Sequence, residues 1–142
     1  SRTASPAVAS ASPAAQEKIN RIISLAKNYL GVNYVYGGAS PSGFDCSGFT
    51  YYVFKQVGIT LNRVASEQAK QGRYIKRAEL RAGDLLFFDT NGGNNYINHV
   101  GIYIGGNQFI HASSAKSGAK VKISALDSFY SSSYMTARRI IE

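Results

Sequence analysis

The apolar residues of this chain change their spacing near residue 74, and this change limits the folds open to it. Before that point, apolar side chains such as Ile19, Ile22 and Ala26 recur every three to four residues, as in an α-helix with one buried face. Beyond it, short runs rich in β-branched and aromatic residues repeat with a period of about two, which is typical of β-strands. Helices followed by antiparallel strands indicate an α+β fold rather than alternating βα units.

The same patterns give approximate element boundaries. We expect helices over 16–30, from Asp45 or Cys46 to Val57, and over 66–71. We expect strands over 85–88, 99–104, 108–112, 121–123 and 135–140. The predicted architecture is therefore a set of N-terminal helices packed on a mostly antiparallel sheet of about five to six strands.

Residues 1–15 are nearly all Ala, Ser and Pro, a composition that favours a linker. The chain has no initiator Met and no charged-then-apolar signal segment. We therefore expect a fragment of a longer precursor with a further N-terminal domain, in which residues 16–142 form one domain.

Composition excludes several classes of protein. The chain has 142 residues, of which 44% are hydrophobic and 17% charged, as in a single globular domain. No apolar run reaches the ~18 residues of a membrane span. One Cys and two His residues exclude a disulfide scaffold and are too few for an ordinary four-ligand zinc site. We expect no metal and no cofactor, and a monomer.

The net charge of +8 comes from 16 Lys+Arg against 8 Asp+Glu and favours contact with polyanions. The basic residues are scattered, however, and the only adjacent pairs are Lys76-Arg77 and Arg138-Arg139. A nucleic-acid-binding protein would carry a basic run or cluster, so we expect no nucleic-acid partner. Two explanations of the positive charge remain: a solvated basic surface, or contact with the anionic polymers of a bacterial wall.

The single cysteine, Cys46, lies in the segment G-F-D-C-S-G-F at an expected helix start. Free backbone N–H groups and the partial positive charge of a helix N-terminus favour a thiolate, and the same N–H groups can stabilise an oxyanion. A buried, inert cysteine is the alternative. The small residues around Cys46 fill a core poorly and leave room for a substrate.

The two histidines lie on neighbouring expected strands. His99 opens H-V-G-I-Y-I, His111 lies in Q-F-I-H-A-S, and a Gly-Gly-Asn turn at 105–107 joins them. A three-residue turn pairs Ile104 with Gln108 and places both imidazoles on one face of the sheet. A two-residue turn places them on opposite faces.

A thiol at a helix start and two imidazoles on one sheet face form a nucleophile, a base and an orienting group. We expect Cys46 to attack a carbonyl carbon. His99 takes the thiol proton and returns it to the leaving amine. His111 fixes the orientation of His99.

Five motifs then appear in a fixed order. They are Y-x-x-G-G at 34–38, D-C-S-G-F at 45–49, G-D-L-x-F-F at 83–88, H-V-G-I-Y-x-G at 99–105 and F-I-H-A at 109–112. In this order and spacing the chain resembles the NlpC-type bacterial cell-wall cysteine peptidases, which share a papain-like core. The resemblance covers about residues 17–140.

This resemblance implies a secreted or wall-associated hydrolase of peptidoglycan stem peptides, cutting between D-isoglutamate and a diamino acid such as meso-diaminopimelate or lysine. It assigns the triad to Cys46, His99 and His111 and places Tyr34 beside the thiolate. It also implies substrate binding by Asp45, Ser47, Arg63, Ser66 and Gln68, and Tyr36 is a candidate to line the groove. An N-acetylmuramoyl-L-alanine amidase or acyltransferase of related fold and a non-catalytic wall-binding module are the alternatives.

Overall fold

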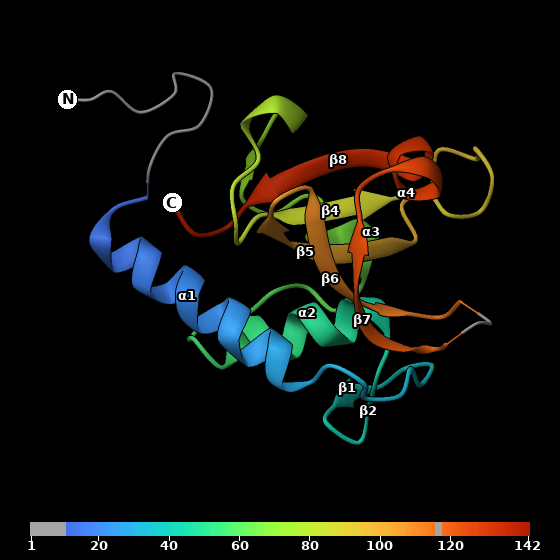
Figure 1. Ribbon diagram of the computed structural model, residues 1–142, viewed down its shortest axis with the longest axis horizontal. Coiled ribbons are helices and arrows are strands. Elements are labelled where there is room, and N and C mark those ends of the chain that lie inside the picture. Colours follow the sequence, from blue (N-terminus) through green and yellow to red (C-terminus); the bar gives the residue numbers. More distant parts are fainter. Residues whose placement is uncertain (1–10, 116–117) are drawn as a thin grey trace.

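A computed structural model describes residues 11–115 and 118–142, and Figure 1 shows their arrangement. A six-stranded antiparallel sheet has the strand order β3-β8-β4-β5-β6-β7. Its strands are β3 (Arg73–Tyr74), β4 (Leu85–Phe88), β5 (His99–Gly105), β6 (Gln108–Ser113), β7 (Lys120–Ala125) and β8 (Tyr134–Arg139). The predicted papain-like α+β fold is confirmed.

The helices are α1 (Pro13–Asn28), α2 (Cys46–Lys55), α3 (Ala65–Gln68) and α4 (Ser128–Ser133), and a short 3-10 turn covers Arg77–Glu79. The two longer helices, α1 and α2, lie together on one side of the sheet (Figure 1). A small ribbon of β1 (Ala39–Ser40) and β2 (Gly43–Phe44) leads into α2. The ribbon therefore ends two residues before Cys46, the candidate nucleophile.

Both faces of the sheet are buried at its centre, whereas the outer strands β3 and β7 keep exposed positions. On one face, Ile22 of α1 and Phe49 of α2 pack against Val100 and Ile102 of β5. On the other face, a second cluster gathers around Phe88. All four residues of β4 are therefore buried, although alternation between a core and a solvent face is usual for antiparallel sheets.

Helix α1 begins three residues earlier than the sequence predicted. Ser12 is the N-cap and accepts a hydrogen bond from the Ala15 N–H at 3.2 Å, and Pro13 occupies the first turn. Ser at the N-cap and Pro at the first helical position are both helix-start signals. The predicted linker over 1–15 is thus wrong for its last three residues, and its first ten lie outside the described residues.

The β5–β6 hairpin keeps the predicted register by a different route. Ile102 pairs with Ile110 and Tyr103 with Phe109, but Gly105, not Ile104, pairs with Gln108. The turn therefore has two residues, and a bulge between Tyr103 and Gly105 absorbs the extra one. The bulge restores the register of the ladder, so the two histidines share a face as predicted.

Candidate active site

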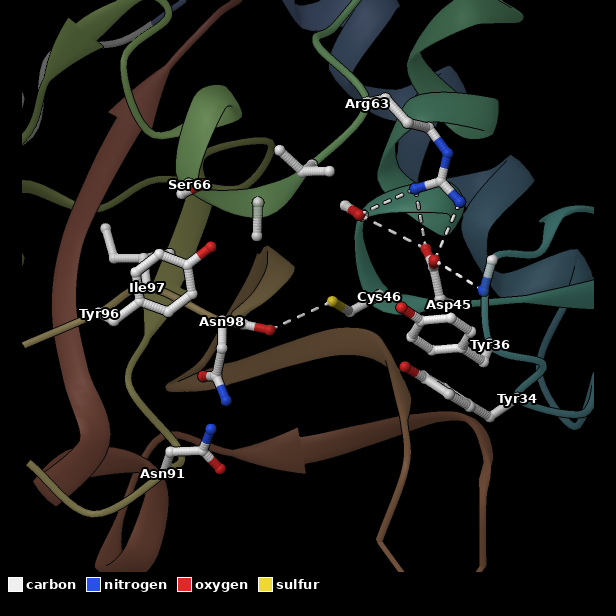
Figure 2. Close-up of a pocket in the computed structure, with 14 residues that line it drawn as sticks. Tyr34, Tyr36, Asp45, Cys46, Arg63, Ser66, Asn91, Tyr96, Ile97 and Asn98 are labelled. Carbon is white, nitrogen blue, oxygen red and sulfur yellow. Dashed lines mark hydrogen bonds and ion pairs between the residues drawn. The ribbon is translucent and has the colours of Figure 1, made fainter. Parts of the chain in front are cut away.

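A cleft of about 750 Å³ opens at the start of α2 (Figure 2). Most of the predicted site residues line it: Tyr34, Tyr36, Asp45, Cys46, Ser47, Arg63 and Ser66. The opposite wall comes from the loop before β5, including Asn91, Tyr96 and Asn98. The structure thus brings together residues that are up to 64 positions apart in the chain.

Cys46 is the first residue of α2, and Asp45 caps that helix by accepting a hydrogen bond from the Gly48 N–H at 2.6 Å. The Cys46 Sγ donates to the Asn98 carbonyl at 3.6 Å (Figure 2). Burial and the Asp45 carboxylate raise the pKa of the thiol, and the N–H groups of Val100, Ser47 and Cys46 only partly offset this. The predicted lowering of the thiol pKa is therefore wrong for the free protein, because desolvation of the thiolate outweighs the helix N-terminus.

The two imidazoles are bonded to each other. His99 Nε2 lies 2.7 Å from His111 Nδ1, and His111 Nε2 lies 2.8 Å from the Ser124 Oγ. Burial lowers the pKa of both rings, and the charges of His99 and Lys122 lower the pKa of His111 further. Both rings are therefore neutral at pH 7.

Ser124 extends this row of hydrogen-bonded side chains, and it was not among the predicted site residues. It lies on β7 opposite Phe109, one diagonal step from His111. The predicted strand over 121–123 stopped one residue short of it. Extending the alternation of β7 by one residue would have placed a hydroxyl beside His111.

The backbone of β5 brings His99 to the cysteine. The Cys46 Sγ donates a hydrogen bond to the Asn98 carbonyl, and the Val100 N–H lowers the pKa of the thiol. Asn98 and Val100 are the residues on either side of His99. Within residues 11–115 and 118–142, no hydrogen bond joins Sγ to either imidazole. Because His99 Nε2 is bonded to His111, Nδ1 is the ring nitrogen left to exchange a proton with a thiol.

Asp45 already has partners. Its carboxylate accepts hydrogen bonds from Arg63 Nη1 at 3.1 Å, Arg63 Nη2 at 2.9 Å and the Gly37 N–H at 3.1 Å (Figure 2). Arg63 Nη1 also donates to the Ser47 Oγ at 3.0 Å. The expected role of Asp45 and Ser47 in substrate binding therefore requires competition with the Arg63 guanidinium. In the free protein these residues fix the loop around Gly37 to the start of α2.

Tyrosines form the rim of the cleft. Tyr34 is half-buried, and burial followed by the charge of a Cys46 thiolate raises the pKa of its hydroxyl, so this hydroxyl stays protonated and can donate. Tyr36 is 93% exposed, and Tyr96 on the opposite wall is 56% exposed. The aromatic residues expected near a groove do line it.

The cleft wall at 90–98 is held by polar contacts. Asp89 accepts hydrogen bonds from the N–H groups of Asn91 at 3.0 Å and Asn95 at 2.9 Å. The Asn98 side chain accepts from the Thr90 N–H at 2.9 Å. The polar residues of this segment therefore shape a defined wall.

Gln68 does not line the cleft, contrary to expectation. It is fully buried, accepts from the Thr50 hydroxyl at 2.8 Å, and donates to the Ser47 carbonyl at 3.1 Å and the Asn62 carbonyl at 2.8 Å. Gln68 therefore holds the first turns of α2 in place through Ser47 and Thr50 and does not face the cleft. The resemblance implied a role in substrate binding, but the amide is buried with hydrogen-bond partners, as buried polar groups usually are.

None of the helices in the described part of the chain has the length and apolar character needed to cross a membrane.

Three comparisons relate this chain to known proteins. The model of the NlpC/P60 family matches residues 31–139. A Bacillus subtilis relative named gamma-D-glutamyl-L-lysine dipeptidyl-peptidase is 40% identical over 130 residues, covering 89% of this chain and 43% of that protein.

Among solved structures, an NlpC/P60 family protein from Bacillus cereus superposes with a TM-score of 0.82 at 36% identity, covering 87% of this chain and 40% of that one. The NlpC/p60 domain of the peptidoglycan hydrolase SagA superposes with a TM-score of 0.71 at 39% identity, covering 84% of this chain and 97% of that one. The chain spans less than half the length of the two Bacillus proteins.

Proposed function

This chain belongs to the NlpC/P60 family, and from that premise we propose that it is a cysteine endopeptidase of peptidoglycan stem peptides. The proposed scissile bond joins D-isoglutamate to the following diamino acid. The name of the Bacillus subtilis relative, which specifies a gamma-D-glutamyl-L-lysine bond, supports this choice. The observation that carries the proposal is the row of hydrogen bonds from His99 through His111 to Ser124. This row begins next to Asn98, whose carbonyl accepts a hydrogen bond from the Cys46 thiol.

The reaction begins from a neutral thiol and a neutral imidazole. As the Cys46 sulfur attacks the peptide carbonyl carbon, its proton passes to His99 Nδ1. The tetrahedral intermediate collapses to a thioester, and the imidazolium gives that proton to the departing amine nitrogen. A water molecule then attacks the thioester with His99 as base. The acid is released and the thiol regains its proton.

The negative charge that develops on the carbonyl oxygen needs donors in place. The backbone N–H groups of Cys46 and Ser47 lie at the helix start, and both lower the pKa of the sulfur. We assign them to the oxyanion site, with the protonated Tyr34 hydroxyl as a further donor. Preorganised donors of this kind contribute on the order of 10²–10³ in rate each.

His111 and Ser124 set the proton positions on His99. If His99 is to accept at Nδ1, its proton lies on Nε2 and is donated to His111 Nδ1. His111 then carries its proton on Nε2 and donates to the Ser124 Oγ. This arrangement keeps the basic nitrogen of His99 directed away from His111 and free to react.

A defined tetrapeptide tests the proposal. Incubation with L-Ala-γ-D-Glu-diaminopimelate-D-Ala should give L-Ala-D-Glu and a diaminopimelate–D-Ala dipeptide by mass spectrometry. Cys46→Ala should abolish cleavage, whereas Ser24→Ala, on the exposed side of α1, should not change it. Far-UV circular dichroism checks that both variants fold.

Other results would redirect the proposal. Release of a free lactyl muramic acid from a muropeptide would identify an amidase. Binding of wall material without any cleavage by the wild-type chain would identify a binding module. Cleavage that survives Cys46→Ala would contradict thiol catalysis.

A further inference from the structure

The loop before β5 contains the one Asn-Gly pair in the sequence, Asn91-Gly92. Asn91 is exposed and lines the cleft of Cys46, where Figure 2 shows its side chain directed toward that of Asn98. In a pair of this kind the backbone nitrogen of the glycine can attack the side-chain amide carbon of the asparagine, because the glycine has no Cβ to obstruct the approach. Asparagine is a thermolabile residue for this reason. Asn91 therefore has a reactivity that the proposed hydrolysis does not use.

The structure leaves both reacting groups accessible. Gly92 has a φ of 80°, and a Cβ built on it would meet no atom beyond its chain neighbours within 4 Å. Among residues 11–115 and 118–142, neither the side-chain amide of Asn91 nor the N–H of Gly92 has a hydrogen-bond partner. The N–H of Asn91, by contrast, donates to the Asp89 carboxylate at 3.0 Å. Closure of a ring between Asn91 and Gly92 therefore displaces no neighbour and breaks no side-chain hydrogen bond.

The reaction consumes only water and releases only ammonia. The Gly92 nitrogen bonds to the Asn91 Cγ, and the Nδ2 group leaves as ammonia with the proton that the Gly92 nitrogen gives up. The product is a cyclic imide. Water then adds to one of its two carbonyl carbons and breaks the bond from that carbon to nitrogen. Opening at Cγ leaves an aspartate at position 91, and opening at the backbone carbonyl leaves an isoaspartate, so both products carry a carboxylate in place of a neutral amide.

A new carboxylate would change the charge of the cleft. Among the residues that line it, Asp45 is the one acid and Arg63 the one base, and they form an ion pair of 2.9 Å. A carboxylate at position 91 would therefore have no cationic partner among these residues. The acyl half of the proposed substrate carries the free carboxylate of D-isoglutamate, and the reaction develops a further negative charge on an oxygen atom. Repulsion between like charges opposes both substrate binding and catalysis.

We propose that Asn91 is a site of spontaneous deamidation, and that the resulting carboxylate lowers the activity of the cleft and so limits the working life of the enzyme. The effect on activity rests on the proposed function. The modification itself does not, because it needs only the Asn91-Gly92 pair and water.

Peptide mapping tests the modification. The purified chain is incubated for days in neutral and in mildly alkaline buffer, and mass spectrometry with fragmentation locates each conversion of an amide to a carboxylate. Asn91 should be converted, and faster in the alkaline buffer, because the attacking nitrogen must lose its proton. Asn107 is the internal control: it is also exposed and has a φ of 61°, but the Cβ of Gln108 follows it, so it should stay intact.

Kinetics with the defined tetrapeptide test the effect on activity. Asn91→Asp introduces the charge at once and should lower kcat/KM by on the order of tenfold at low ionic strength. The loss should shrink at high salt, which screens exposed charges. Asn94→Asp adds the same charge to the same loop outside the lining of the cleft, and should leave kcat/KM unchanged. Asn91→Gln should keep its initial activity throughout the incubation, because its longer side chain would have to close a larger ring.

The outcomes separate this inference from the proposed function. An intact Asn91 after the alkaline incubation, or equal conversion of Asn107, would overturn the modification site. Full conversion of Asn91 without loss of kcat/KM would overturn the effect on activity. Failure of the fresh wild-type chain to cleave the tetrapeptide would overturn the proposed function and the effect on activity with it, and the peptide map would still decide the modification.

Discussion

Breaking the buried ion pair between Asp84 and Arg139 should cost more stability than breaking any exposed pair in the described structure. Asp84 lies just before β4, and Arg139 ends β8. Their side chains are 1% and 3% exposed, and two hydrogen bonds of 2.8 and 2.9 Å join them. Asp84 also accepts from the Arg81 N–H at 2.9 Å, and Arg139 donates to the Glu79 carbonyl at 3.0 Å.

Asp84→Asn removes the charge that compensates a buried guanidinium. Breaking a buried pair in this way costs about 3–5 kcal/mol, because the remaining charge has lost its partner in a medium of low dielectric constant. For 142 residues the entropy of unfolding is about 0.3 kcal/mol/K. We therefore expect the Tm to fall by about 10–17 °C.

Thermal unfolding followed by circular dichroism measures this change, and the chain supplies a control. Arg73 and Glu142 form an ion pair whose side chains are 55% and 59% exposed, so Glu142→Gln should leave the Tm unchanged within error. Replacing Asp84 with Leu and Arg139 with Met together should recover most of the loss. If Asp84→Asn lowers the Tm no more than Glu142→Gln, the reasoning from burial is refuted.

Three further predictions concern the site. His111→Gln and Ser124→Ala should each retain more kcat than His99→Ala, because orientation is more replaceable than proton transfer; equal losses in steady-state assays would contradict this division. Cys46 in the free protein should react with iodoacetamide near pH 7 no faster than an ordinary thiol, since its pKa is raised; rapid alkylation well below pH 7 would instead indicate a thiolate–imidazolium pair. Because burial lowers the pKa of both His99 and His111, the unfolded chain binds more protons than the folded one below about pH 6.5. Stability should fall as the pH drops through that range, and replacing both histidines with Gln should flatten the slope of Tm against pH.

Local patterns in the sequence predicted much of the fold. The helix α2, the strand β4 and the β5–β6 hairpin follow from hydrophobic period and turn residues, which act over a few neighbours. The short strand β3 and the helix α4 were missed. Their positions depend on partners far along the chain: β3 pairs with β8, and Tyr130 of α4 packs on Phe88 and Phe109.

The site shows the same division. Cys46 and the shared face of the two histidines were found from local motifs and strand parity. The contacts that were not predicted join segments separated by 13 residues or more. They are the ion pair of Asp45 with Arg63, the hydrogen bond from buried Gln68 to Ser47, and the hydrogen bond between His111 and Ser124. The thiol pKa was predicted in the wrong direction for a related reason: its burial depends in part on the distant residue Asn98.

The bulge in the β5–β6 hairpin has a consequence for how this protein can vary. Surface connections between strands normally tolerate insertions and deletions. Here the loss of Ile104, the residue that the bulge accommodates, would leave the pairs Ile102–Ile110 and Tyr103–Phe109 in place, because the two-residue turn would then close a regular ladder. A single-residue deletion inside β5 or β6, between the bulge and either histidine, would instead reverse the direction of that histidine relative to the other. Changes in length that preserve the shared face of the two imidazoles should therefore be confined to the bulge and the turn.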